Sequence, residues 1–146
     1  HCVEVSDAAW PYLRRNLAPT AVDVRLGDMA DAFADLDGTV DVVVANPPYI
    51  PLTEYEGVPA EVRDYDPALA LFSGPDGLDA TRVVADVAAR LLRPSGWVCS
   101  EHADAQGESA PQVFVRHGGF RRVADRLDLT ARPRFVVAQR AGRMAP

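Results

Sequence analysis

The stretch VDVVVANPPY, which runs from Val40 to Tyr49, decides the fold of this 146-residue chain. Its three consecutive valines are β-branched, and a run that is apolar on both faces is typical of a buried strand in a parallel sheet. The run ends at Asn46-Pro47-Pro48, because proline cannot donate to a strand ladder and restricts the residue before it. We therefore predict a buried parallel strand over Val40–Ala45, with a loop that starts at Asn46.

Strand and helix patterns alternate on both sides of this stretch. Further strands are expected over His1–Val5, Ala21–Leu26, Trp97–Ser100, Phe120–Leu127 and Phe135–Gln139. Helices are expected over Ala9–Leu17 (capped by Ser6 or Asp7), Met29–Leu36 (a short link), Gly77–Arg93 and Gln106–His117. Residues 50–76 hold several prolines and acids without periodicity, which is typical of a binding loop. This order predicts one α/β domain with a mostly parallel sheet and an antiparallel pair at its C-terminal end.

Composition argues against several classes of protein. The formal net charge is -6, which counts mildly against a protein that grips phosphate backbones. No apolar run approaches the roughly 20 residues of a membrane span. The two cysteines, Cys2 and Cys99, form no CxxC and have no histidines at ligand spacing, so we expect buried, reduced thiols in a cytoplasmic protein and no metal site.

Polar residues follow the first three expected strands. Glu4 lies near the end of the first, Asp28 follows the second and Asn46 follows the third. Ligands of open parallel sheets bind beyond the carboxyl ends of the strands. Glu4 could accept hydrogen bonds from ribose hydroxyls and Asp28 could reach an adenine amino group. Taken singly, each position is more simply interpreted as a solvated strand-end acid and as a Gly-Asp turn.

The tetrad Asn46-Pro47-Pro48-Tyr49 carries a stronger chemical signal. Two prolines fix the backbone so that carbonyls without sheet partners point into the cleft. A planar nitrogen that carries two hydrogens needs two acceptors in its plane, which the Asn46 side chain and the Pro47 carbonyl would supply. Tyr49 could stack on the planar group. The alternative is a Pro-Pro pair that merely starts a loop.

The tetrad and its surroundings resemble the HemK/PrmC family, methyltransferases that act on the glutamine of peptide-chain release factors. The likeness runs from Val3 to about Arg140. Its motifs are Val3–Ser6, Asn46–Pro51, Asp66–Leu71, Gly74–Asp79, Leu91–Gly96, Glu101–Gly107 and Asp128–Arg134. The tetrad alone is shared with adenine-N6 DNA methyltransferases and some rRNA methyltransferases, and residues 66–79 favour the release-factor branch.

The resemblance implies a Rossmann-like class I fold that uses S-adenosyl-L-methionine and transfers its methyl group to the N5 amide of the glutamine in a Gly-Gly-Gln motif. Residues 1–146 would be the C-terminal part of the catalytic domain. The implied partner is a release factor, without nucleic acid, membrane or metal. Asn46, Pro47, Pro48 and Tyr49 would be the catalytic and substrate-binding residues. Glu4 would hold the cofactor ribose, Asp28 and Met29 would border the adenine, and Asn46 would also touch the methionine end.

The sequence also departs from the family's pattern. Asp66 stands where the family usually has glutamate, and Met29 occupies a position where bulkier side chains also occur. No G-x-G-x-x-G is present, so we expect the first strand and the glycine-rich loop to be missing. That strand would lie between the strands of Glu4 and Val43, and its loss would leave two unpaired ladders. We therefore expect a fragment that binds the cofactor weakly alone. The alternatives are a methyltransferase for an exocyclic amine of a DNA or rRNA base, or a non-catalytic fragment.

Overall fold

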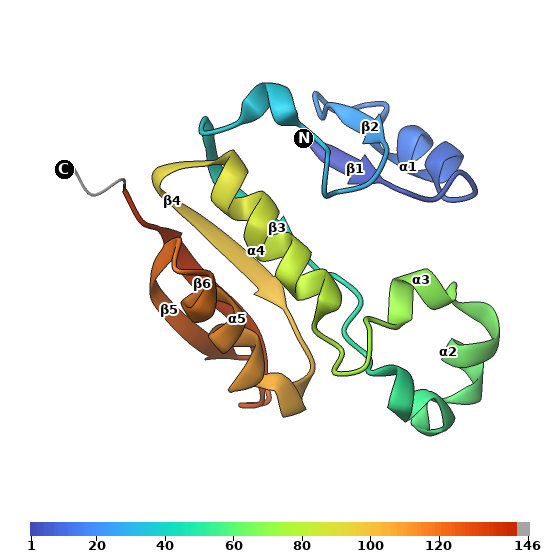
Figure 1. The fold of residues 1–146 in the computed structure, drawn as a ribbon. Coiled ribbons are helices and arrows are strands. Elements are labelled where there is room, and N and C mark those ends of the chain that lie inside the picture. The colour runs from blue at the N-terminus through green and yellow to red at the C-terminus, as the bar shows by residue number, and fades with distance from the viewer. Residues whose placement is uncertain (143–146) are drawn as a thin grey trace.

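The computed structural model describes residues 1–142, and its elements follow the expected order (Figure 1). The strands are β1 (Cys2–Glu4), β2 (Val24–Leu26), β3 (Val40–Ala45), β4 (Leu92–Glu101), β5 (Phe120–Leu127) and β6 (Pro133–Arg140). The α-helices are α1 (Trp10–Leu17), α2 (Ala60–Tyr65), α3 (Ala68–Leu71), α4 (Asp79–Leu91) and α5 (Ser109–His117). Three 3₁₀-helices complete the list: η1 (Ala34–Leu36), η2 (Leu52–Gly57) and η3 (Asp104–Gln106).

The strands form two separate sheets. β1 and β2 pair in parallel, and the other four lie in the order β3-β4-β6-β5. β3 runs parallel to β4, whereas β6 is antiparallel to both of its neighbours. The expected α/β fold with an antiparallel C-terminal pair is therefore confirmed. The bounds of β3 and β5 are those that the sequence predicts.

One face of the four-stranded sheet carries the hydrophobic core. Val43, Val98 and Ala138 lie side by side in register across β3, β4 and β6. Helices α4 and α5 cover this face (Figure 1). The fully or nearly fully buried residues of the core are Val84, Ala85, Ala88, Leu92, Val98, Phe114, Phe120, Val136 and Ala138. At roughly 1.5–3 kcal/mol for each large apolar side chain, this cluster is the main stabilising element of the sheet.

The opposite face of the same sheet is bare. Val42 pairs with Trp97 and Val44 with Cys99 in the register of β3 and β4. Val42 is 56% exposed, Val44 75% and Trp97 37%. The prediction that β3 is buried on both faces is therefore wrong. Val42 and Val44, two of its three consecutive valines, project from the face that no helix of the described residues covers.

A slot separates the two sheets. Within residues 1–142, β1 pairs only with β2, and β3 pairs with β4 and with no strand on its other edge. A cavity of about 400 Å³ lies between them, and we call it the slot. Its lining comes from the first strand, from the link after β2, and from β3 and α4. The residues are His1–Val3, Met29, Ala32, Phe33, Leu36, Val40, Val42–Pro47, Val84, Val87 and Leu91. The interruption falls at the position where the sequence predicts a missing central strand.

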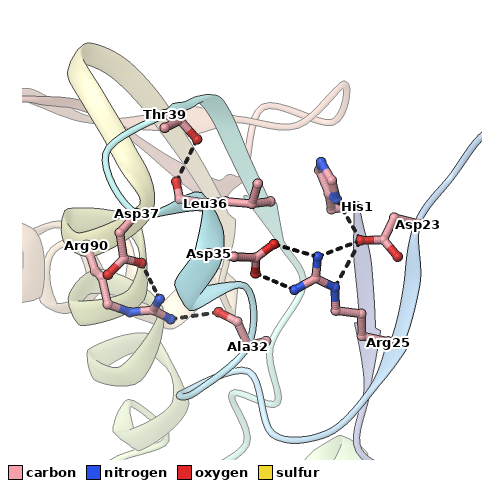
Figure 2. A network of polar contacts seen from close by, with 9 residues as sticks. All are labelled: His1, Asp23, Arg25, Ala32, Asp35, Leu36, Asp37, Thr39 and Arg90. Carbon is pink, nitrogen blue, oxygen red and sulfur yellow. Dashed lines mark hydrogen bonds and ion pairs between the residues drawn. The ribbon is translucent and has the colours of Figure 1, made fainter.

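Polar contacts hold the two-stranded sheet beside the slot (Figure 2). Arg25 on β2 forms hydrogen-bonded ion pairs with Asp23 at 2.9 Å and Asp35 at 2.5 Å. Arg90 near the end of α4 bonds Asp37 at 2.5 Å and the Ala32 carbonyl at 2.8 Å. These contacts tie the link over residues 27–39 to β2 on one side and to α4 on the other. The two sheets are thus joined through that link and not by a strand ladder.

Several local predictions need correction. Met29–Leu36 is helical only over its last three residues, and residues 50–76 hold the short helices η2, α2 and α3 in place of a plain loop. Ser6 does not cap α1, since its Oγ accepts from the N–H of Ala9, the residue directly before the helix, at 3.2 Å and from no N–H within the helix. Cys2 and Cys99 are free thiols but only half-buried.

The predicted Gly77–Arg93 and Gln106–His117 helices also differ at their ends. α4 ends at Leu91 because Leu92 already pairs with Val40 in β4, and the register shifts around Pro94 and Gly96. Gln106 belongs to η3, and α5 begins only at Ser109. Pro94 and Gly96, which directly follow the expected Gly77–Arg93 helix, therefore lie in an irregularity inside a long strand.

Candidate active site

The tetrad Asn46–Tyr49 lies directly after the carboxyl end of β3, as predicted. Asn46 is exposed, whereas Pro47 is buried, and both line the slot. The strand positions them, because β3 is held by its pairing with β4 up to Ala45 opposite Ser100. The structure therefore brings Asn46 and the adjoining Pro47 to a cavity whose lining is mostly apolar.

Tyr49 is held at both of its ends. Its hydroxyl donates to Glu101 Oε1 across 3.4 Å, and Glu101 is the last residue of β4. Its backbone carbonyl accepts a hydrogen bond of 3.1 Å from Gln106 Nε2. Burial, followed by the Glu101 charge, raises the pKa of the Tyr49 phenol above its ordinary value. The ring therefore stays neutral and its orientation is fixed.

The end of β4 supplies polar groups that the sequence reasoning missed. Glu101 and Gln106 were assigned to the family motif without a role. His102 is fully buried, with its ring nitrogens 2.8 Å from the Ala103 carbonyl and 3.0 Å from Asp125 Oδ1. The signal that could have found them is the rule already used for Glu4 and Asn46, because β4 is a further parallel strand with an acid at its carboxyl end.

The three other predicted cofactor residues lie around β1 and β2. Glu4 ends β1, and its Oε1 accepts from the Ser6 N–H at 2.7 Å. Asp28 is exposed, and its Oδ1 accepts from the Ala30 N–H at 2.8 Å, so half of its carboxylate is used in a turn. Met29 is half-buried and lines the slot. The structure thus brings Met29, Asn46 and Pro47 to one cavity, with Glu4 and Asp28 at the neighbouring strand ends outside its lining.

Two other features are absent from the described part of the chain. No group of three or more histidine, cysteine, aspartate or glutamate side chains in residues 1–142 is placed to hold a metal ion. None of the helices described there is long and apolar enough to cross a membrane.

Comparison with solved structures gives the class to which the fold belongs. A methyltransferase from Pyrococcus furiosus superposes with a TM-score of 0.62 over 96% of this chain and 61% of its own, at 20% identity. A release factor-specific protein-(glutamine-N5) methyltransferase from Alicyclobacillus acidocaldarius gives a TM-score of 0.50 over 97% of this chain and 78% of its own, at 23% identity. The fold is that of a class I methyltransferase, as predicted.

Curated relatives are closer in sequence. The release factor glutamine methyltransferase of Streptomyces coelicolor is 55% identical over 97% of this chain and 50% of its own length. That of Mycolicibacterium smegmatis is 47% identical over 97% of this chain and 50% of its own. No family model matches the sequence. This chain is therefore a homologue of release factor glutamine methyltransferases, which confirms the resemblance, and it spans about half the length of the curated relatives it matches.

A third relative has a different acceptor in its name. The 4-amino-L-phenylalanine/4-methylamino-L-phenylalanine methyltransferase of Streptomyces pristinaespiralis is 43% identical over 85% of this chain and 42% of its own length. A glutamine amide and an aromatic amine both present a nitrogen with two hydrogens attached to a conjugated group. The same half of the fold therefore occurs in proteins named for two acceptors of similar local shape.

Proposed function

We propose that this chain is the acceptor-binding part of a methyltransferase that uses S-adenosyl-L-methionine to methylate the glutamine side-chain amide of the Gly-Gly-Gln motif of peptide-chain release factors in the cytoplasm. The observation that carries the proposal is the position of Asn46 and Pro47 at the mouth of the slot, beside a Tyr49 that is anchored at both ends. The relatives at 55% and 47% identity support release factors as the substrate class.

The residues around the slot fit the cofactor. Glu4 uses Oε1 for the Ser6 N–H, which leaves its second oxygen for the ribose hydroxyls. Met29 offers an apolar side chain at the slot, where an adenine ring could pack, and Asp28 follows β2 nearby. Asn46 would touch the methionine end. Bound S-adenosyl-L-methionine supplies an electrophilic methyl group next to Asn46.

The tetrad would act by binding and orienting the acceptor amide. An amide nitrogen is a poor nucleophile, because its lone pair is delocalised into the carbonyl. The Asn46 side-chain oxygen and the Pro47 carbonyl accept its two N–H groups, which increases electron density on nitrogen and fixes its direction of attack. Tyr49 packs on the planar group while its hydroxyl is held by Glu101. The proton leaves after methylation has made the nitrogen acidic, so a strong base beside the tetrad is unnecessary.

The slot itself supports a proposal about how the sheet is completed. Within residues 1–142, β1 and β3 each have one edge without a partner strand, and the cavity between them has apolar walls. Unpaired backbone groups at a central edge are strongly destabilising when they are buried. The matched relatives are about twice as long as the matched region. We infer that an extended strand parallel to β1 and β3 fills the slot, and that residues 1–146 form the C-terminal part of the catalytic domain.

A chimera tests the proposed function directly. It joins the part of the S. coelicolor relative that precedes its matched region to residues 1–146 of this chain. Labelled methyl transfer is then measured onto a bacterial release factor, the same factor with its Gly-Gly-Gln glutamine changed to alanine, 4-amino-L-phenylalanine and duplex DNA. We expect label on the unmodified release factor alone.

Each other outcome identifies a different activity. Label on both release factors would move the acceptor away from that glutamine. Label on the amino acid would favour the arylamine chemistry of the S. pristinaespiralis relative, and label on DNA would favour a base amine. A folded chimera that binds the cofactor but labels none of these acceptors would overturn the proposal, and a chimera that does not bind the cofactor would favour a non-catalytic fragment.

A further inference from the structure

Gln106 is a buried polar side chain that the proposed mechanism does not use. It is only 6% exposed, and every polar atom of its amide has a partner. Its Nε2 lies 3.1 Å from the Tyr49 carbonyl, 3.3 Å from the Gly77 carbonyl and 3.4 Å from the Asp76 carbonyl. Its Oε1 accepts from the Ala103 N–H at 3.0 Å. One side chain thus joins the end of the tetrad, the turn before α4 and the segment after β4.

The backbone of Gly77 closely approaches the same carbonyl. Its φ is +74°, a conformation that L side chains rarely adopt. A Cβ built there would overlap the Tyr49 carbonyl oxygen and lie 2.7 Å from Gln106 Nε2. The Tyr49 carbonyl is therefore in close contact both with the Gly77 backbone and with the amide donor of Gln106. A carbonyl so enclosed cannot rotate without breaking several contacts at once.

The backbone of Tyr49 in turn orients the two groups proposed to bind the substrate amide, which are the Asn46 side-chain oxygen and the Pro47 carbonyl. Pro47 and Pro48 restrict the φ angles between Asn46 and Tyr49, so a rotation at Tyr49 is passed along a stiff segment. At the other end of the tetrad, β3 fixes Asn46 by its pairing with β4. The tetrad is thus a short bridge with one end set by a strand and the other by Gln106.

From this geometry we propose that Gln106 is a positioning residue for the acceptor amide. By holding the Tyr49 carbonyl, it sets the directions of the Pro47 carbonyl and of the Tyr49 ring, and so determines the rate of methyl transfer. The proposal rests on the proposed function. It predicts that loss of the hydrogen-bond donor at position 106 lowers kcat. The affinities for the cofactor and for the release factor should change little, because every residue proposed to contact them remains in place.

Gln106→Glu in the chimera is the sharpest test, because it keeps the shape and the acceptor for the Ala103 N–H but replaces the donor. A carboxylate oxygen would face three carbonyl oxygens, so the tetrad is displaced. We expect kcat to fall by about ten- to a hundredfold at pH 8 with both KM values within about threefold, on the scale of a small misplacement of a reacting group. The introduced carboxyl can donate again once it is protonated, so kcat should recover as the pH is lowered, unlike that of the unsubstituted chimera.

Gln139 provides a matched control. It is also a buried glutamine, 7% exposed, and its Nε2 donates to the Ser95 carbonyl at 3.0 Å, away from the tetrad. Gln139→Glu removes a comparable buried donor but should leave kcat unchanged at every pH. A similar loss of kcat in both variants, or an unchanged kcat in Gln106→Glu, would overturn the proposal.

A second readout keeps the test independent of the substrate. Gln106→Leu removes the donor without adding charge, and the freed Tyr49 ring should move away from Glu101 into solvent. The pKa of Tyr49, followed by NMR of labelled tyrosine and assigned with Tyr49→Phe, should then fall toward its ordinary value. An unchanged pKa would overturn the positioning role. The pKa measurement needs no methyl transfer, so it tests the positioning role even if the chimera methylates none of the acceptors. A failure to methylate would count against the proposed function alone.

Discussion

The four-stranded and two-stranded ends of this molecule are held together by different forces. At the four-stranded end, Phe114, Val136 and Ala138 are 0% exposed, and two helices cover one face of the sheet. At the two-stranded end, none of the residues of α1, Trp10–Leu17, is buried. There the fold depends on ion pairs and hydrogen bonds of Arg25 and Arg90 (Figure 2). Surface ion pairs contribute little compared with a packed core.

The tetrad lies on the border between these two ends. Its contacts through Glu101, Gln106 and Gly77 all reach into the well-packed side. The residues assigned to the cofactor, Glu4 and Met29 among them, belong to the loosely held side. The proposed acceptor-binding half of the site is therefore preformed in this chain, whereas the proposed cofactor-binding half would depend on the strand that we infer to fill the slot.

Phe114→Ala should have the largest effect, because it opens a cavity in the packed side. Phe114 is fully buried and meets Phe120 edge to face, with ring centroids 5.3 Å apart. The expected loss is about 3–5 kcal/mol of unfolding free energy, measured by denaturant titration of the chimera. Val115→Ala on the same helix is the control, since Val115 is 50% exposed and should change stability by under about 0.5 kcal/mol. Equal effects would mean that this core does not hold the sheet.

Asn46→Ala should damage activity and spare stability. Removing one of the two acceptors that hold the amide should lower kcat of the chimera by about a hundredfold or more. The melting temperature should not change, because Asn46 is exposed. Thr53→Ala, an exposed substitution in η2, should leave turnover intact. Turnover near that of the unsubstituted chimera would refute the role of the tetrad.

Val44→Thr is made both in the 146-residue protein, where the slot is open, and in the chimera, where we expect the slot to be filled. The substitution is nearly isosteric, and Val44 is 75% exposed in this chain, so the 146-residue protein should change in stability by under about 0.5 kcal/mol. In the chimera the added strand and its connection would cover Val44, and a buried hydroxyl without a partner should destabilise by about 1–2 kcal/mol. Denaturant titration with Val44 and with the substitution, in the 146-residue protein and in the chimera, measures the two changes in unfolding free energy. The same small effect in both proteins would mean that the slot stays open.

Local signals explain which parts of the fold the sequence predicts. The bounds of β3 follow from consecutive valines ended by prolines, and both the pattern and the stop lie within one short stretch. The same pattern predicts burial wrongly, because burial depends on which segments pack against Val42 and Val44. The residues Pro94-Ser95-Gly96 directly follow the expected Gly77–Arg93 helix. In the structure they belong to β4, because Leu92 pairs with Val40 and the strand therefore begins before them.

The candidate site divides in the same way. Asn46–Tyr49 could be predicted because strand-end position and residue chemistry are both carried by adjacent residues. Gln106 could not, since its contact with Tyr49 spans 57 residues and requires the Gly77 turn to pack beside both of them. Sequence alone shows that Gln106 is present, and only the fold shows that it is buried and donates to three carbonyls.

Arg90→Ala should loosen the link that carries Met29 and Phe33. Arg90 donates to the Ala30 and Ala32 carbonyls and pairs with Asp37. Loss of these bonds should destabilise the link by about 1 kcal/mol. Amide hydrogen exchange should accelerate over residues 27–39 and stay unchanged over β4–β6. Arg93→Ala removes an exposed ion pair with Asp41 and is the control. Acceleration throughout the chain would show that the two ends do not unfold separately.

Glu101→Gln is the mildest change and tests how the packed side holds Tyr49. Burial is the larger cause of the raised pKa of Tyr49, and the Glu101 charge is the next. Removing that charge should lower the pKa toward the ordinary tyrosine value of about 10 without restoring it fully, because burial remains. A raised folded-state pKa stabilises the neutral phenol, so stability is present at neutral pH and is lost as the pH rises through that pKa.

The alkaline loss begins at the unfolded-state pKa, which this substitution does not change. In the Glu101→Gln variant the loss should therefore be smaller and end at a lower pH, and NMR titration of labelled tyrosine in the chimera measures the fall in the folded-state pKa of Tyr49. Tyr49→Phe, which has no phenol to ionise, should abolish the Tyr49 part of the alkaline loss with either residue at position 101. If Glu101→Gln leaves the titration unchanged, the 3.4 Å contact does not persist in solution. The ring would then be oriented by burial and by the Gln106 contact with its backbone, and the packed side would hold Tyr49 from one end only.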